Sequence, residues 1–395
     1  MDINKRDLLL AGLTVGAGVA ASNAVAQPAA PAAGTRARGG IDQDAASSNS
    51  GIQPSTVDLN YKPRRINKMI ELWEDGQKVY YTHDGVTPDM GPNDAYEHGK
   101  KMAKTYCDAI EYNIEHGPLD FTAFANFMQG LAAGGPTKSG HATPAVFVIP
   151  PCTGLSEQFA YNNAWIIWNF LDLGAHGIMI AHSRDPLAIE VYVQEAGRYP
   201  LEYPNTPKLA RRGLRTMAAA APAIWGISNN KYMHVSDPWP LNPRGELVFG
   251  VKIEDLEGDP HAPEILAVKG LSFGEIASVD QTLSLIGLAA YPEEAADGGV
   301  FAGGRGGRGG PGAGPAGAAA GAAAGGRGGR GAGGPGGGPG GGNPEQASVL
   351  QAMRDKMIPE FKKNNIHMFG DTFLGANNEE AVRKAREASG RKMPV

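Results

Sequence analysis

Ionisable side chains follow several apolar runs of the sequence, at the point where each run ends. The residues in question are His83, His116, His182, Glu254 and Glu275. If the runs are parallel strands, their carboxyl ends meet at one edge and these side chains converge there. A single histidine at a strand end is more often a hydrogen-bonded structural residue, so the prediction depends on the convergence. Imidazoles beside carboxylates suit a divalent cation such as Mg²⁺, Mn²⁺ or Co²⁺.

The stretch from Cys107 to Phe121 indicates how the chain would position one of these side chains. Ile110, Tyr112 and Ile114 alternate with polar residues, which is the period of a strand with two unlike faces. Gly117 and Pro118 follow His116 directly and end the strand, and apolar residues then continue at helical spacing. A strand, a short loop and a helix form half of a βαβ unit, with His116 at the strand's carboxyl end.

The same alternation of strand and helix recurs along the chain. We predict strands at 79–82, 110–114, 145–149, 177–181, 247–253, 271–273 and 366–369, and helices at 66–73, 159–173, 186–196, 353–361 and 378–389. This pattern predicts an α/β fold of the (β/α)8 TIM-barrel type. The eighth strand could only be the tail 392–395, so either the barrel is incomplete or the tail closes it. Residues 198–239 read as a long active-site loop.

Three segments are predicted to lie outside the folded domain. Residues 1–26 form a signal peptide with Lys5-Arg6, an apolar run and Ala24-Val25-Ala26, and they resemble a twin-arginine signal, the alternative being an ordinary secretory signal. Residues 27–64 read as a disordered leader, and 298–342 as a disordered insertion rich in Gly, Ala and Arg. A single domain then consists of 65–297 and 343–395, and the protein is expected to be periplasmic or exported.

Charge and composition exclude some partners and favour others. A formal net charge of -5 argues against a general nucleic-acid binder, because the phosphate backbone requires a basic face. The apolar run near the N-terminus is short and broken by glycines, so no stable membrane span is expected. Cys107 and Cys152 would lie at opposite ends of a parallel barrel and are predicted to be free thiols. We expect a small-molecule substrate and a homo-oligomer.

Several blocks of the sequence resemble the HpcH/HpaI aldolase and citrate lyase family of metal-dependent pyruvate aldolases. The resemblance covers about residues 66–389 with the insertion removed. The blocks that carry it are Glu115-His116-Gly117-Pro118, residues 174–180, Arg198-Tyr199-Pro200, Arg212-Gly213-Leu214-Arg215 and Val251-Lys252-Ile253-Glu254. The family has a TIM barrel in which a divalent metal chelates a 2-oxo acid while a carbon–carbon bond is made or broken.

The resemblance also implies roles for individual residues. It makes His116 the catalytic acid/base and Glu254 a metal ligand. Glu275 takes the place of the family's second ligand, an aspartate, with Asp280 as the alternative. In the family the histidine has an aspartate partner three residues earlier, and Asn113 stands there in this chain.

Substrate binding is predicted for Phe147, His182 and Arg215. Phe147 falls where the family has an arginine that holds the oxo-acid oxygen. A pocket with Phe147, Tyr112 and Trp225 would accept a more apolar or aromatic substrate than the usual sugar-acid compounds. The main hypothesis is therefore a metal-dependent carbon–carbon lyase acting on a 2-oxo acid or related carbonyl compound. The alternatives are a non-catalytic protein that binds a small acid and a hydratase-type lyase on the same scaffold.

Overall fold

The computed structural model describes residues 62–83, 92–216, 218, 220–287, 344–369 and 379–388. The signal peptide, the Gly-rich insertion and the tail at 392–395 lie outside the described residues, as does nearly all of the leader. What the sequence predicts for those segments therefore stays a prediction. None of the described helices is both long enough and apolar enough to cross a membrane.

Seven parallel strands form one sheet in chain order, with every strand paired to the next. They are β1 (Tyr81–Thr82), β2 (Ala109–Asn113), β3 (Ala145–Ile149), β4 (Gly177–Ile180), β5 (Val248–Ile253), β6 (Phe273–Ile276) and β7 (His367–Met368). Sequential parallel order with helical crossovers is the arrangement of a TIM-type barrel. The predicted α/β fold class is confirmed.

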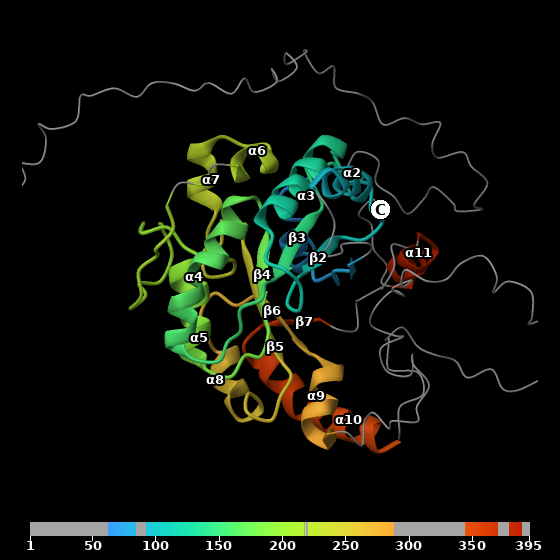
Figure 1. Ribbon diagram of the computed structural model, residues 1–395, viewed down its shortest axis with the longest axis vertical. Helices are drawn as coiled ribbons and strands as arrows, with labels where there is room; N and C mark the ends of the chain where they lie inside the picture. The colour runs from blue at the N-terminus through green and yellow to red at the C-terminus, as the bar shows by residue number, and fades with distance from the viewer. Residues whose placement is uncertain are drawn as a thin grey trace, which may run out of the picture. The chain divides into compact units, whose positions relative to one another are not determined.

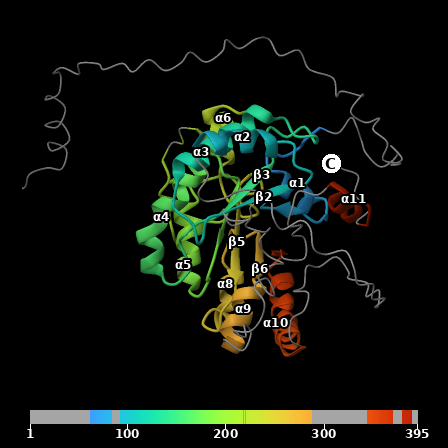
Figure 2. The same ribbon diagram turned by 45° about the vertical axis from the view of Figure 1, so that its right-hand side comes forward.

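Helices connect the strands on the outside (Figures 1 and 2). They are α1 (Lys68–Glu74), α2 (Pro92–Met102), α3 (Phe121–Gly134), α4 (Glu157–Asp172), α5 (Pro186–Glu190), α6 (Ala221–Trp225), α7 (Asn229–Val235), α8 (Ala262–Leu266), α9 (Ser278–Ile286), α10 (Pro344–Lys363) and α11 (Glu379–Ala388). A π-helical turn, Val191–Ala196, continues α5. Polar caps begin several of them: Asp120 Oδ1 accepts the Thr122 and Ala123 N–H groups at the start of α3.

Aromatic contacts show that the sheet curls toward closure. Tyr81 of β1 stacks on Phe369, which follows β7, with ring centroids 4.6 Å apart. The ring of Phe147 of β3 lies 5.6 Å from that of Phe369 and 5.5 Å from that of Phe273 of β6, measured between centroids. Side chains from the first, middle and last strands can meet only on the concave side of a curled sheet. The part of the barrel interior in which these rings meet is thus an aromatic core.

The other face of each strand packs against the helices. Because side chains alternate along a strand, Ile110 and Tyr112 point outward while Glu111 points inward. Tyr112 meets Phe124 of α3 with ring centroids 4.8 Å apart. Burying each such side chain stabilises the fold by about 1.5–3 kcal/mol. Tyr112 is therefore part of the outer core and does not reach the barrel interior.

The structure corrects several predicted boundaries. The sixth strand is Phe273–Ile276 rather than 271–273, so Glu275 lies within the strand and not after it. Residues 198–239 contain α6 and α7 and are not one irregular loop. Cys107 and Cys152 are buried free thiols, as predicted.

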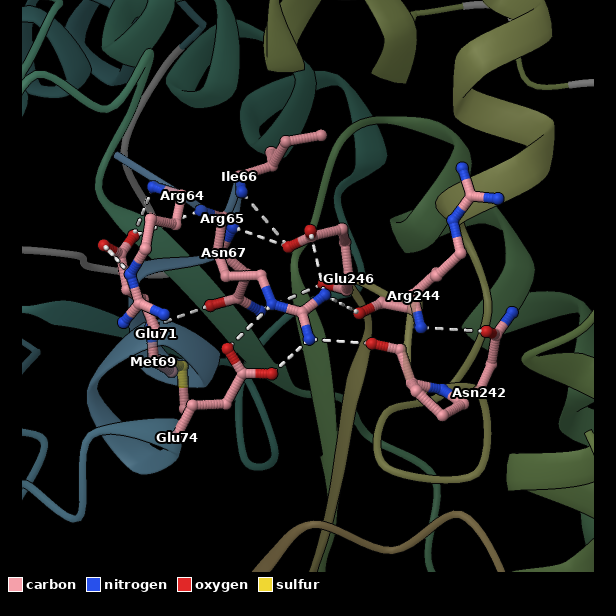
Figure 3. A network of polar contacts seen from close by, with 12 residues as sticks. Arg64, Arg65, Ile66, Asn67, Met69, Glu71, Glu74, Asn242, Arg244 and Glu246 are labelled. Carbon is pink, nitrogen blue, oxygen red and sulfur yellow. Dashed lines mark hydrogen bonds and ion pairs between the residues drawn. The ribbon is translucent and has the colours of Figure 1, made fainter. Parts of the chain in front are cut away.

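A polar network holds the segment before α1 against the amino ends of the strands (Figure 3). Glu246, two residues before β5, accepts the backbone N–H groups of Ile66 and Asn67 at 3.2 and 3.0 Å. The Arg65 guanidinium pairs with both Glu74 and Glu246. Since these residues are far apart in sequence, the network joins the start of α1 to the start of β5.

Candidate metal centre at the carboxyl ends of the strands

Three side chains from neighbouring parts of the sheet meet beyond its carboxyl edge. Glu115 follows β2, His182 follows β4 and Glu254 follows β5. Each offers one ligand atom within 4.8 Å of those of the other two. Glu115 Oε1 lies 3.6 Å from His182 Nε2, and Glu254 Oε1 lies 3.7 Å from His182 Nδ1. Two carboxylates and an imidazole form a donor set that suits a divalent transition metal.

Local backbone structure holds these side chains. The Glu115 N–H donates to Asn113 Oδ1 at 3.1 Å, and the Ile114 N–H donates to the Ile149 carbonyl, which prolongs the pairing beyond β2. His182 has a φ of 45°, in the left-handed region that a non-glycine residue rarely occupies. Its N–H donates to Glu254 Oε1 at 2.6 Å. Backbone strain of this kind concentrates at functional sites, where surrounding contacts maintain it.

Two carboxylate oxygens of the cluster indicate that the residues fit a cation. Glu115 Oε1 and Glu254 Oε2 are buried, and neither has a hydrogen-bond partner among the described residues. Leaving a buried polar atom unsatisfied costs about 1–3 kcal/mol. A cation between these oxygens would satisfy both. Glu115 and Glu254 with His182 would therefore hold a divalent metal such as Mn²⁺ or Co²⁺.

Burial and neighbouring charges perturb the ionisable groups. Burial raises the pKa of Glu254 to about 7, although the Lys252 ammonium opposes that shift. The hydrogen bond to Asp255 raises the pKa of His182 from its ordinary value, with Nδ1 and Asp255 Oδ2 3.1 Å apart. A hydrogen-bonded carboxylate of this kind fixes the orientation of an imidazole ring.

Lys252 lies inside the barrel, next to the three side chains of the candidate metal centre. It lies on β5 in register with Glu275 of β6, and its Nζ donates to Glu115 Oε2 at 3.1 Å. Glu111 of β2 lies in the same inner layer and faces His83 at 3.8 Å. Burial raises the pKa of Glu275 to about 7, while Lys252 acts in the opposite direction. Carboxylates thus surround the Lys252 ammonium next to the metal cluster.

His116 lies at the exposed side of the centre. Its side chain is 64% exposed, and Nε2 is 3.6 Å from Glu115 Oε1. Asn113 stands in the place of the family's aspartate. Its Nδ2 donates to Glu111 Oε1, and its Oδ1 accepts the Glu115 N–H, so both of its partners are close in sequence. The carboxylate beside His116 is therefore that of Glu115.

The structure does not bring the other predicted residues into this cluster. The Phe147 side chain is fully buried in the aromatic interior. Arg215 is equally buried, and it donates to Asp172 at the end of α4, to Tyr232 and to Ser236. Since α4 leads into β4, Arg215 lies toward the amino ends of the strands. It serves there as a buried link between helices.

The predicted metal pair also differs from the observed cluster. Within the described ranges, the group that could hold a metal contains Glu254 but neither Glu275 nor Asp280. Glu275 belongs to the inner layer with Lys252 because it lies inside β6 and not beyond it. His182, predicted to bind substrate, offers a ligand atom instead.

Sequence reasoning missed Glu115 and Lys252, and a signal for each was present. Glu115 continues the period-two phase of Glu111 and Asn113, so it had to face the same side of the sheet. Lys252 is a cation inside an otherwise apolar strand, which requires an acidic partner. Both residues lie within the sequence blocks that contain His116 and Glu254.

Comparisons with known proteins find similar solved structures only. No family model matches the sequence, and no curated protein matches it significantly. Among solved structures, an HpcH/HpaI aldolase/citrate lyase family protein from Burkholderia cenocepacia is similar at TM-score 0.48 and 16% identity, over 83% of this chain and 91% of that one. An HpcH/HpaI aldolase from Desulfitobacterium hafniense gives 0.43 and 14%, over 82% and 88%. Macrophomate synthase gives 0.43 and 15%, over 85% and 86%. All three TM-scores are below 0.5, so no inference about this chain is drawn from the matches.

Proposed function

We propose that the protein is a metal-dependent carbon–carbon lyase acting on a 2-oxo acid or a related carbonyl compound. The observation that carries the proposal is that Glu115 and Glu254, which meet at His182, each have a buried carboxylate oxygen without a hydrogen-bond partner among the described residues. A bound divalent cation would supply a Lewis acid for the oxygens of such a substrate. The interior below is filled by aromatic side chains, so a substrate has to approach from the side on which His116 is exposed.

Residues of the chain itself would transfer the proton and orient the metal ligands. His116 is the exposed imidazole beside the centre, and it is suited to take or return the proton of a substrate hydroxyl near neutral pH. Glu115 Oε1 lies 3.6 Å from Nε2 of both His116 and His182, so one carboxylate contacts both imidazoles. Asp255 fixes the ring of His182 through Nδ1 and leaves Nε2 directed at Glu115.

A lyase assay with and without metal tests the proposal. Metal-free protein would be incubated with a panel of aliphatic and aromatic 4-hydroxy-2-oxo acids, and pyruvate release would be measured as Mn²⁺, Co²⁺ or Mg²⁺ is added. Release is expected only with metal. His116→Ala should reduce turnover by about 100-fold or more, the usual scale for general acid–base catalysis, without changing the melting temperature.

His234→Ala provides the matched control, because His234 is an exposed histidine on α7. Its turnover should equal that of the parent. Tight binding of a 2-oxo acid without any turnover would contradict the lyase and favour a binding protein. Export to the periplasm is a separate proposal that depends on residues 1–26, and the mass of the mature protein from cell fractions would test it.

A further inference from the structure

Lys252 lies on the inner face of the sheet, directly beneath the metal cluster. Its neighbours Val251 and Ile253 pack in the outer core with the helices, so alternation places Lys252 on the same side as Glu254. The Lys252 side chain is 11% exposed and that of Glu115 is 5% exposed. The ion pair between them is therefore largely shielded from water.

The charges around Lys252 come from several strands. Glu254 on its own strand, Glu115 and Glu111 from β2, and Glu275 from β6 all interact electrostatically with its ammonium. Carboxylates gathered in a buried site repel one another and lose hydration, which costs several kcal/mol per ion unless a cation compensates. Lys252 is the cation that these four carboxylates share.

The two oxygens of Glu115 have different surroundings. Oε2 accepts a hydrogen bond from Lys252 Nζ at 3.1 Å, whereas Oε1 is buried, has no hydrogen-bond partner in the described ranges and faces His182 Nε2 at 3.6 Å. One oxygen is thus fixed and the other is left available. Metal ligands are commonly oriented in this way by a partner that does not itself touch the metal.

We propose that Lys252 is the positioning residue of the metal centre: it fixes Glu115 through Oε2 so that Oε1 is presented to a divalent cation together with His182 and Glu254. The proposal rests on the metal-dependent function proposed above for the same site. Lys252 is not a covalent nucleophile in this arrangement, because an ammonium that donates to a carboxylate has no free electron pair.

Metal titration of purified full-length variants tests this role. In Lys252→Met the side chain keeps a similar length and loses its charge, and Lys252→Gln is a second neutral variant should the first fail to fold. Mn²⁺ affinity, measured by isothermal titration calorimetry, should fall about 10- to 100-fold in either neutral variant, as when partners of ligands are removed elsewhere. Lys252→Arg keeps the charge and a donor, and its affinity should return to within a few fold of the parent.

Lys231→Met is the matched control, because Lys231 is exposed on α7. Its Mn²⁺ affinity should be unchanged. A folded neutral variant that binds Mn²⁺ as tightly as the parent, or more tightly, would overturn the positioning role. A parent protein that binds no divalent metal would instead refute the proposed function, so the two failures are distinguishable.

Discussion

The two ends of the sheet each contain a buried glutamate, and the two glutamates differ in what surrounds them. Burial raises the pKa of Glu246, at the amino ends, to about 7, and it does the same to Glu254 at the carboxyl ends. Glu246 accepts two backbone N–H groups and pairs with Arg65 (Figure 3). Glu254 accepts one N–H through Oε1, and its Oε2 has no hydrogen-bond partner in the described part of the chain.

Burial and a raised pKa therefore do not by themselves mark a functional acid. Nearly all buried polar groups in folded proteins are satisfied by the protein or by water. At the amino ends the protein supplies the partners, and the network connects α1 to β5. At the carboxyl ends Glu115 and Glu254 meet at His182, and each has a buried oxygen without a hydrogen-bond partner among the described residues, which a bound cation would satisfy.

We expect the largest effect in Mn²⁺ affinity, which should differ between variants of Glu254 and Glu246. Glu254→Gln keeps an oxygen for the His182 N–H but removes a charged ligand. Its Mn²⁺ affinity should fall by about 100-fold or more, since loss of a ligand exceeds the 10- to 100-fold cost of losing a ligand's partner. Glu246→Gln should bind Mn²⁺ like the parent. Calorimetric titration of both variants measures the difference, and equal affinities would remove Glu254 from the metal centre.

A smaller effect should appear in stability at the amino ends. Arg65→Ala leaves the buried Glu246 carboxylate without its ion pair, and the Arg65 side chain is itself only 13% exposed. Unfolding free energy should fall by about 2–3 kcal/mol, below the full cost of breaking a buried pair because the site is partly solvated.

Arg64→Ala is the control for that change, because the Arg64 side chain is 53% exposed. Its loss should be within about 1 kcal/mol, as for surface ion pairs. Urea unfolding of both variants provides the measurement. Mn²⁺ affinity should be unaffected in each, and a loss of metal binding in Arg65→Ala would contradict the separation between the two ends.

Much of the fold could be predicted because its strands are apolar runs with clear boundaries. Residues 145–149 match β3 residue for residue, since Pro150 and Pro151 end the run. The predicted sixth strand, 271–273, lies too early because the apolar run of the sequence stops at Phe273, before Gly274 and Glu275. Glycine and glutamate are both unfavourable in an isolated strand, and here the cross-strand neighbour Lys252 compensates for the charge of Glu275.

The site was less predictable because pairing between strands decides which ends come together. His182 and Glu254 were singled out as residues at strand ends, and the structure brings both into the cluster. Arg215 follows a loop whose course no local pattern specifies, and it packs against Asp172 instead. Glu115 was passed over beside His116, although alternation along β2 places it toward the interior.

The smallest effect, and the sharpest comparison of the two ends, is the pH dependence of stability. A folded-state pKa of about 7 exceeds the ordinary glutamate value of 4.5, so between these values the folded protein binds a proton that the unfolded chain releases. The contribution of each group is therefore fully present below pH 4.5 and declines as pH rises toward 7. For metal-free protein, each of Glu246 and Glu254 should lower the unfolding free energy by about 1–2 kcal/mol between pH 5.5 and 7.5. Either Gln variant should show a shallower decline than the parent in urea unfolding.

Mn²⁺ then distinguishes the two groups, because a cation favours the ionised form of a carboxylate that it contacts. With Mn²⁺ present, the decline due to Glu254 should disappear, and the decline due to Glu246 should remain. The stabilisation that Mn²⁺ provides should therefore increase from pH 5.5 to pH 7.5 more strongly in the parent and in Glu246→Gln than in Glu254→Gln, where His182 still has to release its proton but Glu254 no longer contributes. If Mn²⁺ stabilised the Glu254→Gln variant as strongly and with the same pH dependence as the parent, the cation would have to bind elsewhere. The contrast between a satisfied and an unsatisfied buried acid would then have no functional meaning in this protein.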